Sequence, residues 1–287
     1  MTRNTSKFIG YVKMAAAGML LGGVLSSCSD LDEQDRFVYI KPADAARKVL
    51  IEDFTGQKCV NCPKATDEIH VLQETYGEDN IIAVGIHSGP LGFAGNKKFV
   101  GLLTDLGNTY YYHWGLDHQP VGLVNREAPS DYTAWQGQVM RLIAQKAPVS
   151  LAISNDYNAD SRTVSITVSS EGTTGTTAGK LQIWLVEDGI TAMQMMPDGK
   201  NNLEYVHNHV LRAAVNGDWG TDFTIHEGEE KAQTFTYQLD EKWVPENVSV
   251  VAFVYTDSGV AQVEKAKVVF TPVAPAEYSM TIRTCPS

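Results

Sequence analysis

The stretch VLIEDFTGQKCVNCPK, residues 49–64, joins an apolar run to two cysteines that are separated by two residues. The segment KATDEIHVLQETYG, residues 64–77, follows it with apolar residues at helical spacing and a final glycine, which is typical of a helix and its C-cap. A second apolar run, NIIAVGIH, occupies residues 80–87. Strand, helix and strand within about 40 residues predict a βαβ unit with two parallel strands.

The remainder of the chain divides into a mixed part and a strand-rich part. Residues 119–127 read as a strand introduced by a proline, and residues 131–145 as an amphipathic helix with Asp131 as its N-cap. From residue 148 onward, alternating or apolar segments predict strands at residues 149–158, 163–170, 180–188, 233–240, 248–256 and 266–272. Residues 195–223 read as a long irregular insertion. Short strands separated by turn-rich pieces favour an antiparallel, immunoglobulin-like sandwich.

The first 27 residues have the pattern of a secretory signal. A basic start is followed by MAAAGMLLGGVL, residues 14–25, an apolar core too short to span a bilayer, and by small residues. Cys28 comes directly after them, which resembles a bacterial lipobox in which the cysteine becomes the lipidated N-terminus. Residues 28–45 are polar and acidic and read as a tether, and residues 273–287 read as a tail. We expect a lipid such as palmitate on Cys28 to supply the membrane anchor.

The charge of the chain argues against one class of partner. The formal net charge is −11, and it becomes −14 once residues 1–27, with three basic residues and no acidic one, are removed. An acidic body without a basic stripe repels phosphate backbones, so nucleic acid is excluded as an expected partner. Lipid on Cys28 is the expected membrane contact, and a cell-envelope protein is the expected partner or substrate.

Cys59 and Cys62 form the pattern C-x-x-C between a strand and a helix, which is the arrangement of thioredoxin. Asp53 stands six residues before Cys59, where thioredoxins have a buried acid, and Pro120 precedes a strand, as does the cis-proline that faces their cysteines. Residues 46–147 therefore resemble a thioredoxin-like domain, and residues 148–272 complete the predicted fold as an all-β immunoglobulin-like domain. Lys58 replaces the family's usual tryptophan, so the match is incomplete.

The cysteine pair has three possible roles on this reading. In thiol–disulfide exchange, the sulfur of Cys59 attacks the partner or is attacked by it, and Cys62 resolves the mixed disulfide. Asp53 relays a proton, and Pro120 positions the partner's backbone. No cofactor is needed. This role requires that the sulfur of Cys59 be exposed next to a cis Pro120. In a non-enzymatic binding or assembly module, the pair is a structural disulfide. A copper carrier would need a further ligand, for which His118 is the best candidate, although we predict no metal site.

Other conspicuous residues have plainer interpretations. His207 and His209 alternate, so on a strand they would share one face and could bind metal, although packing against the first domain is favoured. The aromatic run at residues 110–114 is predicted to cover an edge of the core. Cys285 has no evident partner in the sequence.

Taken in order, the lipobox, EDFTGQKCVNCP, GIHSGP, QPVGLVNR and YVHNHVLR resemble the 28-kilodalton outer-membrane lipoprotein family of Gram-negative bacteria. The resemblance implies a thioredoxin-like domain paired with an immunoglobulin-like one and a lipid-anchored location at the cell outer membrane. It does not specify which face of that membrane the body occupies. Some members are described as adhesins, and no reaction comes with the resemblance.

Overall fold

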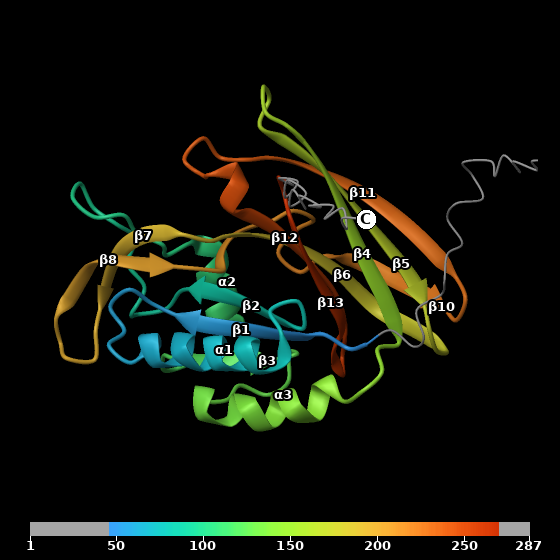
Figure 1. Ribbon diagram of the computed structural model, residues 1–287, viewed down its shortest axis with the longest axis horizontal. Helices are drawn as coiled ribbons and strands as arrows, with labels where there is room; N and C mark the ends of the chain where they lie inside the picture. Colours follow the sequence, from blue (N-terminus) through green and yellow to red (C-terminus); the bar gives the residue numbers. More distant parts are fainter. Residues whose placement is uncertain (1–45, 270–287) are drawn as a thin grey trace, which may run out of the picture. The chain divides into compact units, whose positions relative to one another are not determined.

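The computed structural model describes residues 46–269 (Figure 1). Its helices are α1 (Cys62–Tyr76), α2 (Asp105–His113) and α3 (Trp135–Ile143), and the last follows a 3-10 turn at Tyr132–Ala134. The strands of the first half are β1 (Val49–Thr55), β2 (Ile81–His87) and β3 (Val121–Val124). The second half contributes β4 (Val149–Asn158), β5 (Thr163–Gly172), β6 (Thr176–Glu187), β7 (Ile190–Met195), β8 (Asn201–His207), β9 (Val210–Ala214), β10 (Thr221–His226), β11 (Glu230–Gln238), β12 (Val248–Thr256) and β13 (Gly259–Lys267). The described part is mostly β-sheet.

The largest sheet has eight strands in the order β13-β12-β6-β9-β2-β1-β3, and β10 pairs with β6. β1 runs parallel to β2, as the sequence predicts, and antiparallel to β3. β9 joins the halves, because Val210 pairs with Gly85 of β2 while the same strand pairs along β6. Strands from both halves of the chain therefore belong to one sheet, which fixes segments of the second half close to the end of β2.

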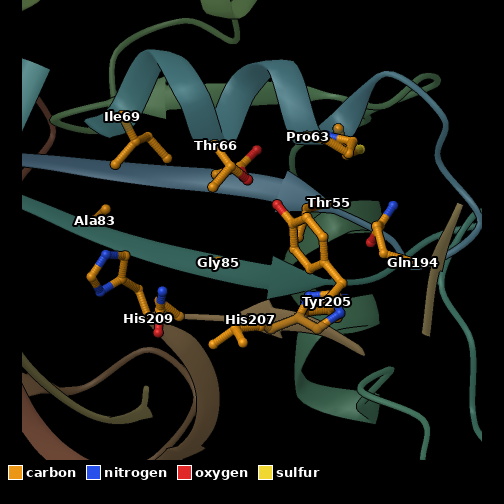
Figure 2. Close-up of a pocket in the computed structure, with 15 residues that line it drawn as sticks. Thr55, Pro63, Thr66, Ile69, Ala83, Gly85, Gln194, Tyr205, His207 and His209 are labelled. Carbon is orange, nitrogen blue, oxygen red and sulfur yellow. The ribbon is translucent and has the colours of Figure 1, made fainter. Parts of the chain in front are cut away.

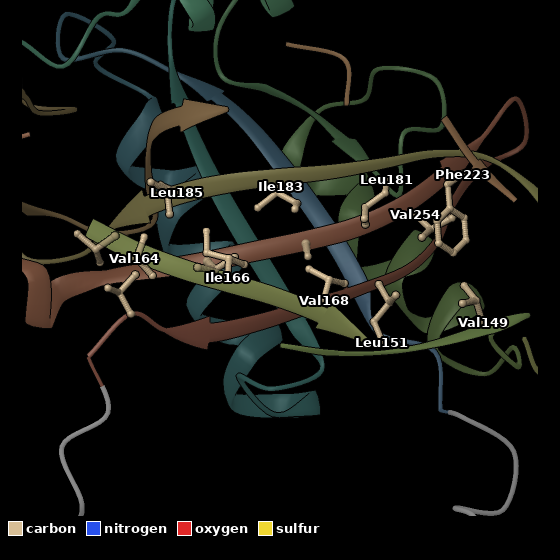
Figure 3. Packing of buried hydrophobic residues seen from close by; sticks show 14 of the residues in the cluster. Val149, Leu151, Val164, Ile166, Val168, Leu181, Ile183, Leu185, Phe223 and Val254 are labelled. Carbon is tan, nitrogen blue, oxygen red and sulfur yellow. The ribbon is translucent and has the colours of Figure 1, made fainter. Parts of the chain in front are cut away.

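Three large hydrophobic clusters pack against the faces of this sheet. α1 and α3 cover one face (Figure 1). There, Ile69, Leu72 and Trp135 pack on Val49 and Ile51. The opposite face of β1 and β2 packs with buried aromatic residues of α2, β6 and β12, namely Tyr110, Tyr111, Trp184 and Phe253. The separate three-stranded sheet β11-β5-β4 covers the remaining part, with a core that includes Val164, Ile166, Val168, Ile183 and Val254 (Figure 3). The predicted aromatic core edge at residues 110–114 thus matches the burial of Tyr110 and Tyr111.

The predicted irregular insertion at residues 195–223 is wrong. It contains the last residue of β7, all of β8 and β9 and the first three residues of β10, and most of β8 is exposed. A strand with two exposed faces lacks the apolar alternation on which strand prediction depends, so the pattern gave no signal there. The last strand also lies earlier than predicted, at Gly259–Lys267, because a short turn after Thr256 sets its register against β12.

Two helix starts differ from the sequence predictions. α1 begins at Cys62, two residues before the predicted segment 64–77, because a proline in the first turn lacks only an N–H that would have no helical partner. Asp131 precedes the 3-10 turn, but its side chain makes no capping hydrogen bond. Its carboxylate lies instead 3.2 Å from Nε2 of His118.

Close packing at β3 leads to one prediction of stability. A Cβ atom on Gly122 would lie 2.4 Å from the Trp135 ring and 2.9 Å from the carbonyl oxygen of Glu52. We expect Gly122→Ala to lower the free energy of unfolding by about 1–3 kcal/mol, measured by denaturant titration. Gly137→Ala is the matched control, because that Cβ would meet nothing within 4 Å. Equal stability of the two variants would contradict the packing argument.

Candidate functional site

Cys59 and Cys62 form a disulfide at the end of β1. The backbone N–H of Cys59 donates to Gly56, which closes the loop, and Cys62 is the first residue of α1. Each cysteine is 1 % exposed. The expectation that the sulfur of Cys59 would be exposed is therefore wrong for this conformation. The physical reason is a segment of the second half that lies over the loop.

Asp53 is buried on β1 and shares an enclosed cavity of about 30 Å³ with Cys62. Its Oδ1 atom has no hydrogen-bond partner among the described residues. Burial raises the pKa of Asp53 to about 7, as expected for a carboxyl group removed from water. Pro63, Thr66 and Tyr205 line the same cavity, and Figure 2 shows the Tyr205 ring between Thr55 and Thr66. A carboxyl group with this pKa can hold or release a proton near neutral pH.

The Gln119–Pro120 peptide bond is cis, as the sequence predicts, and Pro120 is buried. The side chain of Gln119 fixes this loop, because its Nε2 donates to the carbonyl oxygens of Thr55 at 2.6 Å and Ser88 at 2.9 Å. Its Oε1 accepts from the N–H of Leu91, whose own carbonyl accepts from Lys58. The proline loop and the cysteine loop are thus tied together through one intervening segment.

The hairpin β7–β8 closes the cysteine loop. Nε2 of Gln194 donates to the carbonyl oxygen of Cys59 at 2.9 Å and lies 3.3 Å from that of Gly56. The N–H of Met195 donates to the carbonyl oxygen of Gln57 at 2.9 Å. In return, Nε2 of Gln57 donates to the carbonyl oxygen of Met193 at 2.9 Å. A glutamine from each side therefore joins the hairpin to the loop that contains Cys59.

Two buried histidines also line the cavity. The rings of His87 and His207 are 5.1 Å apart. Burial lowers the pKa of His207 to about 4 and that of His87 well below its ordinary value, so both are neutral at pH 7. Nδ1 of His87 and Nε2 of His207 have no hydrogen-bond partner within residues 46–269.

The structure contradicts the less favoured interpretation, in which His207 and His209 share one strand face. β8 ends at His207, and His209 has a φ of 58°, so the chain turns between the two residues. Nδ1 of His209 lies 3.0 Å from Asp188. His118 is exposed and lies between Asp117 and Asp131, so its ring nitrogens face carboxylates and not the cysteines. Over residues 46–269, no group of three or more His, Cys, Asp or Glu side chains is arranged to hold a metal ion.

Comparison with known proteins decides the family. A sequence profile described as outer membrane protein Omp28 matches residues 107–271, which is more than half of the chain. The chain belongs to the Omp28 family. No curated protein matches it significantly.

Two solved structures are similar to this Omp28 protein. HBP35 of Porphyromonas gingivalis has 16% sequence identity and a TM-score of 0.62, with 85% of this chain and 82% of that chain covered. This likeness shows a shared fold alone. A domain of the outer membrane lipoprotein Omp28 from Porphyromonas gingivalis has 27% identity and a TM-score of 0.31, covering 42% of this chain and 88% of that one.

Membership of the family confirms the predicted location. This Omp28 protein is a protein of the cell outer membrane. Within residues 46–269 no helix has the length and apolar character needed to cross a membrane. Cys28, the predicted lipid attachment, and Cys285 lie outside the described residues.

Sequence reasoning missed several residues of the Omp28 site. Gln57 follows the predicted strand by two positions and has no distinctive pattern, and Gln194 stands in a segment dominated by methionines. Both are buried amides that serve backbone carbonyls, a role that depends on which segments meet in the fold. His87 and His207 were each visible in the sequence, but their contact joins residues 120 positions apart. The pairing of β9 with β2 and the hydrogen bonds of the hairpin with the cysteine loop bring that second segment to the cavity.

Proposed function

We propose that this Omp28 protein exchanges disulfides with cell-envelope proteins through Cys59 and Cys62. In this proposal residues 46–147 form a thioredoxin-like domain, residues 148–272 an immunoglobulin-like domain, and lipid on Cys28 holds both at the outer membrane. No cofactor is required, because both electrons that move are carried by sulfur.

The position of Asp53 is the observation that carries this proposal. An acid without a hydrogen-bond partner is costly to bury, and a disulfide that only fastens a loop gains nothing from one. Asp53 lines the same cavity as Cys62 and has a pKa of about 7. Groups that donate and accept protons work best when their pKa lies near the working pH. A proton donor to the Cys62 sulfur explains why the carboxyl group is retained there.

The proposed reaction balances without a further reactant when the partner is a dithiol. One partner thiolate attacks Sγ of Cys59, the Cys59–Cys62 bond breaks, and Cys62 leaves as a thiolate that takes the proton of the Asp53 carboxyl group. The second partner thiol gives its proton to Asp53, and its thiolate attacks the partner sulfur of the mixed disulfide. Cys59 leaves as a thiolate and takes up the proton lost by the first thiol. Two electrons and two protons pass to the protein, and the reverse reaction follows the same path.

Pro120 has a positioning role in this proposal. The proline loop is tied to Thr55 and to the cysteine loop, so it adjoins the place where the partner's sulfur must arrive. A partner segment lying along it would bring its own cysteine to Cys59. Because Cys59 and Pro120 are both buried, we assign exchange to a conformation in which the hairpin β7–β8 has moved.

A test of exchange uses the full-length protein in detergent with a reduced, unfolded protein that contains cysteines. We expect the wild type to form disulfides in that protein at least about tenfold faster than Cys59→Ser, with a matching loss of its own disulfide. Reduced Cys62→Ser, mixed instead with the disulfide-bonded form of the same unfolded protein, should accumulate a mixed disulfide through Cys59, detected by mass spectrometry. Cys285→Ser is the control and should behave as the wild type. Equal rates for the wild type and Cys59→Ser would overturn the proposal.

Burial of both cysteines favours a second candidate, a binding or assembly module with a structural disulfide. On this alternative, Cys59→Ser leaves exchange unchanged and lowers stability, because a disulfide restricts the unfolded chain. Comparison of thermal unfolding and exchange in the same variant therefore separates the two functions.

A further inference from the structure

The hairpin β7–β8 forms a two-stranded sheet separate from the other sheets of the described residues. It extends past the ends of β1 and β2 and lies against the loop that precedes α1 (Figures 1 and 2). Both ends of the hairpin connect to the eight-stranded sheet, because β7 follows β6 after two residues and β9 follows β8 after two residues. The hairpin is therefore tethered at a fixed base while its far end reaches the disulfide.

The contacts of the hairpin with the cysteine loop imitate those of an extended peptide. Met195 donates its main-chain N–H to the carbonyl oxygen of Gln57, and the Gln57 side chain donates to the carbonyl oxygen of Met193. The Gln194 amide then donates to the carbonyl oxygen of Cys59 itself. Main-chain pairing of this kind is the basis on which proteins bind extended segments of differing sequence. Residues 193–195 thus occupy the place that such a segment would take.

Little apolar surface holds the hairpin down. Its buried residues are Ala192, Gln194 and His207, whereas Leu203 is 53% exposed and Val206 is 50% exposed. Polar contacts of this kind can be exchanged for contacts with water or with another chain, and segments with few buried apolar contacts open more readily than the core. Displacement of the hairpin would separate Ala192 and Ile190 from their small cluster with Leu102 and Val210. It would uncover Cys59 and Cys62 without disturbing the three larger hydrophobic clusters that hold the sheets.

We propose that hairpin β7–β8 is a displaceable cap, and that the partner of the cysteine pair is an extended polypeptide segment that takes the place of residues 193–195. This inference rests on the proposed exchange function and names its partner class. An extended segment donates to the carbonyl oxygen of Gln57 in place of Met195 and accepts from the Gln57 side chain in place of Met193. It thereby exposes the disulfide to its own cysteine. Folded proteins without a free extended segment do not open the cap.

The cap is tested by the rate at which dithiothreitol reduces the Cys59–Cys62 disulfide in the full-length protein. Reaction is stopped with an alkylating agent, and labelled Cys59 and Cys62 are measured by mass spectrometry, so other cysteines do not interfere. We expect Gln194→Ala to raise the rate about tenfold, since it removes the amide that bonds to Cys59. Gln136→Ala, an exposed glutamine on α3, is the matched control and should leave the rate unchanged.

A second variant removes the cap itself. Residues 193–204 are replaced by Asn-Gly, a turn that suits two-residue hairpins and leaves Ala192 and Tyr205 paired. We expect its reduction to be faster than that of Gln194→Ala, and circular dichroism establishes that the variant is folded. Equal rates in the wild type, Gln194→Ala and the shortened variant would overturn the cap.

A separate experiment tests whether the partner is an extended polypeptide. Unfolded ribonuclease A with all cysteines blocked should accelerate reduction of the wild type by dithiothreitol, because it displaces the hairpin, and should not affect the shortened variant. Native ribonuclease A is the control. No acceleration of the wild type would overturn the polypeptide assignment. If the cap variants react faster but none oxidises a protein dithiol, the cap stands and the exchange function fails.

Discussion

Between about pH 5 and 8, the free energy of unfolding of the wild type is expected to fall by about 3 kcal/mol because of Asp53, and Asp53→Asn should abolish this fall. The reason is the pKa of about 7 that burial gives the Asp53 carboxyl group, against an ordinary value of 3.8. Between these two pKa values the folded chain holds a proton that the unfolded chain has released. The free energy of unfolding therefore falls as the pH rises through this window, by about 1.4 kcal/mol per unit, and is lowest above pH 7.

The measurement is denaturant unfolding of both proteins, with the disulfide intact, at several pH values. Other buried groups also contribute: lowered pKa values of His87 and His207 act with the opposite sign, so their contribution to stability rises with pH. The difference between the wild type and Asp53→Asn cancels these contributions. Parallel pH curves for the two proteins would show that Asp53 is ionised in the fold, and Asp53 could then not supply a proton to Cys62.

Sequence reasoning was effective where the signal is local. The apolar runs of β1 and β2, the helix between them and the proline before β3 each depend on neighbouring residues, and all four are present. The burial of Asp53, which the sequence suggested through the resemblance to thioredoxin, is present on the wholly buried strand β1.

The closure of the site could not be predicted in the same way. Whether Cys59 is exposed depends on a hairpin about 135 residues later in the chain, and the exposed residues of β8 give little apolar pattern. The single sheet that combines β2 with β9 depends on one pairing, Gly85 with Val210. Periodicity indicates which face of a strand is buried but not which strand lies beside it.

Removal of one member of the Glu52–Arg126 ion pair is expected to lower the free energy of unfolding by about 3–5 kcal/mol. Nη2 of Arg126 lies 3.2 Å from Oε1 of Glu52, and their side chains are 3% and 0% exposed. Burial raises the pKa of Glu52 and Arg126 opposes that shift. Arg126→Met therefore leaves a carboxyl group in the core without its cation, and denaturant titration at pH 7 measures the loss.

The pair also joins the two halves of the chain. Glu52 lies beside Asp53 on β1, and the guanidinium group of Arg126 lies 4.2 Å from the ring centre of Tyr255 and 4.8 Å from that of Phe253, both on β12. Arg126→Met together with Glu52→Leu should therefore restore most of the stability, because apolar residues of similar size replace both charges. We expect the double variant to lie within about 1.5 kcal/mol of the wild type. Additive losses in the double variant would contradict this, since they would mean that the two side chains stabilise the fold through separate contacts and not as a pair.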